Sequence, residues 1–242
     1  MSIGRVKSGS ASVFYETFGN KENKPLVLLH GNGESRKHFK KHIEILQDKY
    51  FIIAVDSRGH GDSGFGFNSL SLSMMVIDLE NVLKDVGIEK AYICGFSDGA
   101  NVAMLFAIKN PDMVLGLIPV SGNLFFKGLT LRTRFWIAFG YYFSKIAGKF
   151  DKRNKIYNEF YLIMYKEPDI IPDILQRVEA PSLVVAGTRD MVLTDHSRLI
   201  AKSLKNAELK LIEGADHFFI YKEAGAFCEM LDEFIGKNQT NE

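Results

Sequence analysis

The chain has 242 residues, of which 46% are hydrophobic and 24% are charged. This length and composition allow a substantial buried core and exclude the disordered and fibrous classes of protein. The formal net charge is only +1, so the chain has no basic surplus for a phosphate backbone, and nucleic acid is not an expected partner.

The start of the chain and its cysteines favour an ordinary intracellular protein. Residues 1–19 lack the apolar core of a secretory signal. No apolar stretch reaches the ~20 residues that a transmembrane helix needs. Cys94 and Cys228 lie far apart, without metal-ligand or redox spacing, and are interpreted as small core residues. We therefore expect a cytoplasmic protein.

Short apolar runs with turn-forming ends follow one another along the chain. These runs lie at 25–31, 50–56, 91–96, 114–120, 182–187 and 207–214. Helix-like segments between or after them lie at 35–48, 72–86, 98–109, 194–204 and 222–235. Because the runs lack polar alternation, they resemble strands buried on both faces, and the order predicts an α/β fold with a mostly parallel sheet flanked by helices. The alternating segment 11–19 is predicted to be an antiparallel edge strand.

Residues 121–178 interrupt this alternation. They hold no convincing strand and many aromatic residues, as in LRTRFWIAFGYYFSKIAGKF. We predict a helical cap here, inserted between two late strands, with residues 1–120 and 179–242 forming the core. An apolar helix with basic flanks can also rest on a membrane surface, although the longest apolar run, FWIAFGYYF, is too short to span one.

Polar motifs follow the predicted strands at their carboxyl ends, where the working groups of an open parallel sheet gather. In chain order they read HGNGES, DSRGHGDSG, SDGA, TRD and ADHFF. These residue types suit acyl transfer. A serine nucleophile needs a base to take its proton, the base needs a carboxylate to fix its tautomer, and the oxyanion needs preorganised N–H donors.

Taken together, the motifs resemble those of α/β-hydrolase-fold enzymes from about residue 11 to residue 236. They are the HG-x-G loop at 30–33, D-x-R-G-x-G-x-S at 56–63 and the G-x-S-x-G elbow at 95–99. The chain order of serine, acid and histidine also matches. The resemblance implies that Ser97 is the nucleophile, Asp190 the acid and His217 the base. Some relatives carry the acid after the preceding core strand, where this chain reads SGN and has no carboxylate.

The resemblance also implies an oxyanion hole and a substrate pocket. The N–H donors would come from Asp98, directly after the nucleophile, and from Asn32, with Gly33 as the alternative to Asn32. Gly33, Trp136 and Phe139 are predicted to line the pocket. The Asp98 side chain is predicted to cap the following helix or, alternatively, to attract the amine of a substrate.

The remaining polar residues of these motifs are assigned structural roles. His30 is expected to brace the backbone of its loop, and Asp56, Arg58 and His60 are expected to hold loops together. Asp195 is interpreted as the cap of its helix. Surface positions are expected for three histidines on helix-like segments, namely His38, His42 and His196.

The predicted reaction is the hydrolysis of carboxylic esters or thioesters of small, largely apolar substrates, without a metal or an organic cofactor. A serine at the elbow argues against the haloalkane dehalogenases and epoxide hydrolases of this family, which use aspartate there. The alternative is a C–C bond hydrolase or lyase acting on a small carboxylate, for which Arg132, Arg134 and Arg153 supply candidate cations. A ligand receptor without catalysis is disfavoured because the triad motifs are complete.

Overall fold

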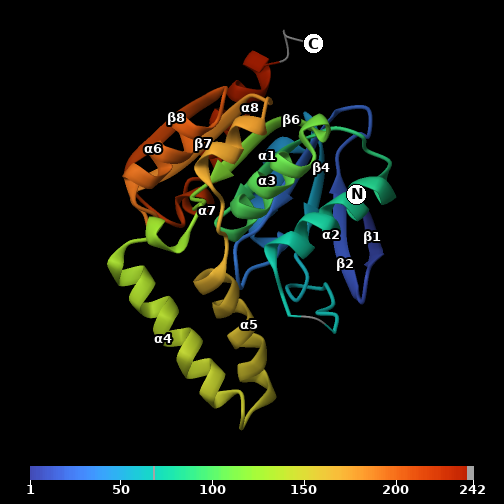
Figure 1. The fold of residues 1–242 in the computed structure, drawn as a ribbon. Coiled ribbons are helices and arrows are strands. Elements are labelled where there is room, and N and C mark those ends of the chain that lie inside the picture. The colour runs from blue at the N-terminus through green and yellow to red at the C-terminus, as the bar shows by residue number, and fades with distance from the viewer. Residues whose placement is uncertain (68, 239–242) are drawn as a thin grey trace.

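The computed structural model describes residues 1–67 and 69–238, and within them the centre of the protein is an eight-stranded sheet (Figure 1). The strand order is β1-β2-β4-β3-β5-β6-β7-β8. β2 is antiparallel to both of its neighbours, and the strands from β4 to β8 run parallel to one another. This confirms the predicted mostly parallel sheet. The strands are β1 (Ser2–Ser8), β2 (Ala11–Phe18), β3 (Lys24–Leu29), β4 (Tyr50–Val55), β5 (Ala91–Phe96), β6 (Val114–Val120), β7 (Ser182–Arg189) and β8 (Ala207–Asp216).

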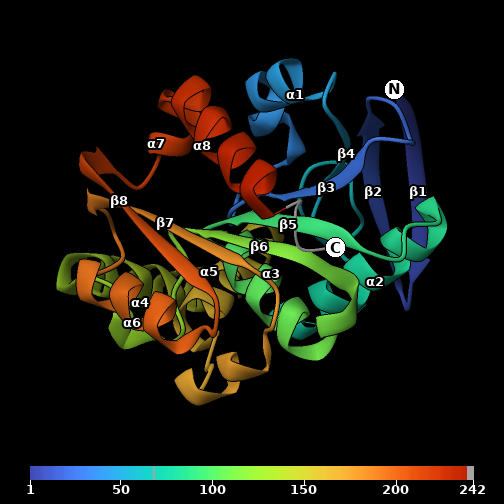
Figure 2. The ribbon, with the colours of Figure 1, turned by 90° about the horizontal axis from the view of Figure 1, so that it is seen from above.

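Helices cover both faces of the sheet (Figure 2). One face carries α1 (Lys40–Leu46), the short α7 (Phe219–Lys222) and α8 (Ala224–Lys237). The other face carries α2 (Leu72–Val86), α3 (Asp98–Lys109) and α6 (Thr194–Ser203). Each face has its own apolar core, with Leu231 of α8 in one and Phe106 of α3 in the other. Both faces of the central strands are therefore covered, as the apolar runs in the sequence predict.

Local sequence accounts for the boundaries of these elements. β4 and β5 are buried at every position, which requires apolar side chains on both faces of each strand. α2 begins after Ser71, whose side chain accepts a hydrogen bond from the Met74 N–H. It ends at Gly87, which has a φ of 75°, a left-handed conformation that glycine adopts without strain.

The edge of the sheet differs from the prediction. β1, which was not predicted, forms the edge, so β2 is an inner strand. The prediction failed because most of β1 is exposed or half-buried and it mixes Arg, Lys, Ser and Gly with its apolar residues. Such an edge strand has little of the apolar signal that marks a buried one.

Between β6 and β7 the chain forms two α-helices, α4 (Leu131–Ala147) and α5 (Lys152–Lys166). They leave the body of the protein side by side as a helical hairpin (Figure 1). Two 3₁₀ turns, Phe126–Gly128 and Pro172–Arg177, flank the hairpin. The predicted helical character of this segment is confirmed, while its status as a separate cap stays a prediction. Among the described residues, no helix has the length and hydropathy needed to cross a membrane.

Candidate active site

Ser97 occupies a sharp turn between β5 and α3. Its φ of 53° lies in the left-handed region, which is strained for a residue with a side chain. Neighbouring backbone leaves no room for larger residues beside it. A Cβ atom on Gly95 would lie 2.1 Å from the Gly99 carbonyl oxygen, and one on Gly99 would lie 2.3 Å from the Leu29 carbonyl oxygen. The G-x-S-x-G spacing is therefore a steric requirement of the turn that presents Ser97.

The three predicted triad residues form one hydrogen-bonded chain. The Ser97 hydroxyl lies 3.1 Å from His217 Nε2, and His217 Nδ1–H donates to Asp190 Oδ1 over 2.6 Å. Ser97 follows β5, Asp190 follows β7 and His217 follows β8. Parallel strands bring these carboxyl ends to the same edge of the sheet. Because Nδ1 donates to the carboxylate, Nε2 is left unprotonated and can accept the serine proton.

A second serine supports the Asp190 carboxylate. Ser121 Oγ–H donates to Asp190 Oδ2 over 2.6 Å, and the Val192 N–H donates to Oδ1 over 3.1 Å. Burial pushes the Asp190 pKa upward, but these bonds and the one from His217 outweigh it and lower the pKa below its usual value. Sequence reasoning missed Ser121, because the SGN motif has no carboxylate and nothing in the sequence marks its serine as a partner of Asp190, 69 residues away.

The predicted oxyanion donors have free backbone N–H groups. Within the described part of the chain, neither the Asn32 N–H nor the Asp98 N–H has an intramolecular acceptor. The Asn32 side chain is engaged, since its Nδ2 donates to Asp98 Oδ2 over 2.8 Å and to the Phe160 carbonyl of α5 over 2.9 Å. Asn32 thus connects the HG-x-G loop to both the elbow and the hairpin. The two N–H groups remain available to a substrate oxygen.

The Asp98 side chain does not cap α3, so that prediction is wrong. Its carboxylate accepts hydrogen bonds from the side chains of Asn32 and Asn101, at 2.8 and 3.3 Å, and from no backbone N–H of the described residues. Burial, with a smaller contribution from the charge of Glu167, raises the Asp98 pKa to about 6 despite these donors. Asp98 lines a small cavity beside Ser97 and His217, and amine recognition stays a prediction.

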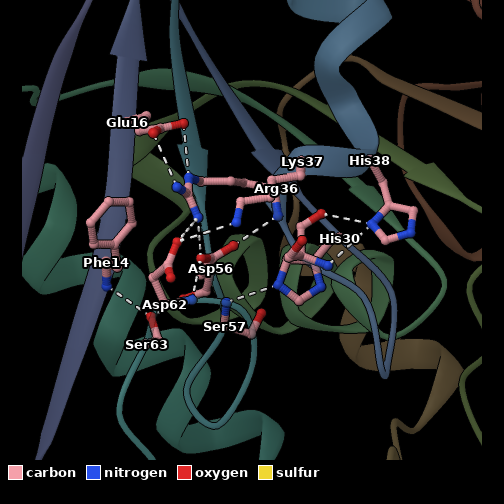
Figure 3. A network of polar contacts seen from close by, with 11 residues as sticks. Phe14, Glu16, His30, Arg36, Lys37, His38, Asp56, Ser57, Asp62 and Ser63 are labelled. Carbon is pink, nitrogen blue, oxygen red and sulfur yellow. Dashed lines mark hydrogen bonds and ion pairs between the residues drawn. The ribbon is translucent and has the colours of Figure 1, made fainter.

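His30 joins the HG-x-G loop to the loop after β4 (Figure 3). Its Nε2 accepts from the Ser57 N–H over 3.0 Å, and its Nδ1–H donates to the Gly31 carbonyl over 2.7 Å. Burial lowers the His30 pKa to about 3, so the ring is neutral at physiological pH. His30 braces the loop as predicted.

A buried arginine that the motifs did not single out holds the same loops. The Arg36 guanidinium pairs with Asp56, Asp62 and Glu16 (Figure 3). Asp56 also accepts from the backbone N–H groups of Arg36 and Asp62, both over 2.8 Å. In the second motif loop, Arg58 pairs with Asp78 of α2. The only sequence signal for Arg36 is that a buried Asp56 needs a cation.

Two histidines predicted for the surface are buried. His42 Nε2 donates to the Ile220 carbonyl over 3.0 Å, and His196 Nε2 accepts from the Leu124 N–H over 2.9 Å. Each ring satisfies a backbone group of a distant segment, which sequence patterns do not reveal. His38 is exposed, as expected. Asp195 pairs with Arg198 over 2.7 Å, and Leu193 takes the N-cap position, so the predicted capping role of Asp195 is wrong.

Two adjoining cavities lie next to the triad. The smaller one, of about 50 Å³, is lined by Ser97 and His217 and closed by Thr133 and Ile137 of α4 and Met164 of α5. The larger one, of about 880 Å³, shares Thr133, Ile137 and Met164 with it and extends between α4 and α5.

Only two of the three predicted pocket residues line a cavity beside the triad. Trp136 and Phe139 line the larger cavity and are 57% and 53% exposed, so aliphatic side chains and not these aromatic rings lie over the triad. Gly33 lines neither cavity. Arg132 lines the larger cavity, as Arg189 does, whereas Arg134 does not. The Arg153 side chain lies outside the part of the chain that is described. No cluster of His, Cys, Asp or Glu that could hold a metal ion occurs among the described residues.

Comparison with known proteins places this geometry in context. A model of the α/β hydrolase fold family matches residues 24–156. Mouse epoxide hydrolase 4 is 26% identical over 119 residues, which cover 48% of this chain but only 33% of the mouse protein. The uncharacterized hydrolase YugF of Bacillus subtilis is 22% identical over 273 aligned residues, with 96% of this chain and 97% of that protein covered.

Among solved structures, a thermophilic esterase from Thermogutta terrifontis superposes with a TM-score of 0.80 at 18% sequence identity. The match covers 98% of this chain and 99% of the esterase. At this identity the likeness concerns the fold alone.

Proposed function

The chain belongs to the α/β-hydrolase-fold family, and from that premise we propose that it is a serine hydrolase of carboxylic esters or thioesters. Its substrates would be small and largely apolar. The observation that carries the proposal is the hydrogen-bonded chain from Ser97 through His217 to Asp190. The free N–H groups of Asn32 and Asp98 and the largely apolar cavity beside the triad support it.

In the proposed acylation step, Ser97 Oγ attacks the carbonyl carbon while His217 Nε2 takes the hydroxyl proton. The carbonyl oxygen becomes an oxyanion that accepts hydrogen bonds from the N–H groups of Asn32 and Asp98. The Asp190 carboxylate, which Ser121 and the Val192 N–H keep hydrogen-bonded, stabilises the imidazolium. The intermediate collapses, and the leaving alcohol or thiol takes the proton from His217.

Deacylation repeats these roles with water as the nucleophile. His217 Nε2 takes a proton from water, the hydroxide oxygen attacks the acyl carbon, and the Ser97 oxygen leaves with the proton that His217 returns. The product is a carboxylic acid. An epoxide would not complete this cycle, because attack by serine on an epoxide forms an ether, which has no carbonyl for water to attack.

A labelling experiment tests the proposal directly. A fluorophosphonate probe should label the wild-type chain, and Ser97→Ala should abolish both labelling and hydrolysis of p-nitrophenyl esters. Ser73→Ala, on an exposed position of α2, is the matched control and should behave as wild type. An unreactive wild type, or label retained in Ser97→Ala, would overturn the proposal.

Two cations beside the cavity favour a second candidate, a C–C bond hydrolase acting on a small carboxylate. Arg132 and Arg189 both line the larger cavity, where they could pair with a substrate carboxylate. Comparison of kcat/KM for a ring-fission diketone acid and for p-nitrophenyl butyrate separates the two candidates. A preference for the diketone acid that Arg132→Gln removes would support this second function.

A further inference from the structure

The outer face of α4 is apolar and exposed. Seven of its side chains are each more than half exposed: Leu131, Phe135, Trp136, Phe139, Tyr142, Phe143 and Ile146. We call these seven residues the α4 aromatic face. At about 100° per residue, they span roughly 140° of the helix circumference. Soluble proteins rarely expose so much contiguous apolar surface unless it contacts a partner or a membrane.

This face is not needed to hold the hairpin together. The opposite side of α4, with buried Ile137, Tyr141 and Ser144, faces inward. Asn158 of α5 bonds there to the Tyr141 carbonyl and the Ser144 hydroxyl, over 3.0 and 3.1 Å. The exposed apolar surface continues past the end of α4, where Phe150 is 87% exposed. In the described part of the chain only Tyr142 of this face has a ring contact or hydrogen bond with α5, to Tyr165, with the two hydroxyls 3.4 Å apart. All seven side chains nevertheless remain more than half exposed.

Positive charge is concentrated on the same hairpin. Residues 131–166 contain eight Lys or Arg residues and two Asp or Glu residues. The rest of the chain contains 22 Lys or Arg residues and 27 Asp or Glu residues. The hairpin thus carries a net charge of +6 and the remainder −5. Four exposed cations of the hairpin have no ion pair among the described residues, namely Arg132, Lys145, Lys149 and Lys155.

We propose that the α4 aromatic face docks on the surface of an anionic lipid bilayer, with Lys145, Lys149 and Lys155 next to the lipid headgroups. Trp, Phe and Tyr on one side of a helix with flanking Lys and Arg suit the interface between headgroups and acyl chains. α4 has 17 residues, and no helix among the described residues is long and apolar enough to cross a membrane. α4 would therefore lie in this interface and not cross it.

Docking in this way would bring the larger cavity to the lipid. Trp136, Phe139 and Phe143 belong to the α4 aromatic face and also line that cavity. A hydrophobic ester could then pass from the bilayer toward the triad without crossing water. The binding itself goes beyond the proposed hydrolysis, because it requires no catalysis and is measured without a substrate.

The apolar part of the surface is tested by cosedimentation with phosphatidylcholine vesicles, with and without phosphatidylserine. The wild type should bind the phosphatidylserine vesicles, and less so at high salt. The variant Leu131→Ser, Phe135→Ser, Ile146→Ser should bind them roughly 100-fold more weakly. None of these three residues lines a cavity beside the triad. The control Ile45→Ser, Phe67→Ser, Ile77→Ser removes exposed apolar side chains elsewhere and should bind as wild type.

The charged part is tested by reversing three lysines. Lys145→Glu, Lys149→Glu, Lys155→Glu should weaken binding by about 100-fold or more, at about 1 kcal/mol for each charge near the surface. Lys41→Glu, Lys84→Glu, Lys90→Glu makes the same change in net charge at exposed positions elsewhere and should have little effect. Two binding results would overturn the proposal: no vesicle binding by the wild type, or an equal loss of vesicle binding in the variants and their controls. The proposal would also be overturned if light scattering showed that the wild type is a dimer and that the variant Leu131→Ser, Phe135→Ser, Ile146→Ser is a monomer.

Discussion

At the scale of single residues, the proton on Ser97 Oγ has one acceptor in the described site, His217 Nε2, at 3.1 Å. In the proposed mechanism, nucleophile and base therefore act in one step. Ser97→Ala and His217→Ala should each lower kcat for a p-nitrophenyl ester by roughly 10⁴- to 10⁶-fold, and the double variant should be little worse than either. The measurement is kcat of the three purified variants. If the fall in kcat of the double variant equalled the product of the two single falls, one of the two residues would be misassigned.

Ser121 is expected to act through Asp190. Ser121→Ala removes a hydrogen bond to a buried carboxylate that His217 needs, so kcat/KM should fall by about 10-fold or more. It should also raise the Asp190 pKa, and a carboxylate with one donor fewer should attract the imidazolium more strongly, which moves the acid limb of the pH–kcat/KM profile to higher pH. Ser197→Ala is the control, because the buried Ser197 hydroxyl has no hydrogen-bond partner among the residues that the structure describes. An unchanged acid limb in Ser121→Ala would leave Ser121 with a packing role only.

Asp98 is expected to make stability depend on pH. Its folded pKa of about 6 lies above the usual value of 3.8, so the folded state binds more protons than the unfolded state between these pH values. The contribution of Asp98 to the free energy of unfolding should therefore fall as pH rises from about 4 to 6. Asp98→Asn should remove this dependence. Urea unfolding at about pH 4 and about pH 6 measures it: the decrease in unfolding free energy between the two should be smaller in Asp98→Asn than in the wild type by about 1–2 kcal/mol. Parallel curves for wild type and Asp98→Asn would contradict the assignment.

At the scale of elements, the Arg36 cluster ties the 3₁₀ turn before α1 to β2 and to the loop after β4. Arg36→Ala would leave the buried Asp56 carboxylate without its cation, beside two further carboxylates. Breaking a buried pair in this way costs about 3–5 kcal/mol of unfolding free energy. Lys205→Ala, which breaks the exposed pair with Glu179, should leave the unfolding free energy nearly unchanged, because water and salt screen such a pair. Equal midpoints of urea unfolding for Arg36→Ala and Lys205→Ala would show that the buried pair stabilises the fold no more than the exposed pair does.

Sequence patterns predicted the elements whose signal is local. β4 and β5 are runs of apolar and aromatic residues that are buried on both faces. α2 has a start signal at Ser71 and a stop signal at Gly87. β1 escaped prediction because its pairing with β2, and not its apolar content, makes it a strand. Its edge position follows from the whole sheet.

The same distinction holds for the site. The order of the motifs predicted that Ser97, Asp190 and His217 meet, since parallel strands end at one edge. Ser121 and the buried His196 were not predictable in this way. Each is defined by a hydrogen bond to a segment about 70 residues away, and a serine or histidine in sequence carries no mark of such a partner.

At the scale of the whole molecule, α4 presents two different surfaces. Thr133 and Ile137 close the small cavity over Ser97 and His217. Trp136 and Phe139 line the larger cavity and extend to the outside. In the proposed hydrolysis the first pair would therefore confine the reacting bond, while the second pair would contact only a chain that extends away from it.

This arrangement predicts how the hairpin selects substrates. Trp136→Ala and Phe139→Ala should raise KM for a p-nitrophenyl octanoate by about 10-fold, since each removes apolar contact with a long acyl chain. They should leave kcat for the acetate unchanged, because the acetyl group fits the small cavity, which neither residue lines. Phe135→Ala is the matched control, as Phe135 is exposed on the same helix but lines neither cavity. If both esters instead lost kcat equally, the two aromatic residues would support the triad through the packing of α4, and chain length would be selected elsewhere.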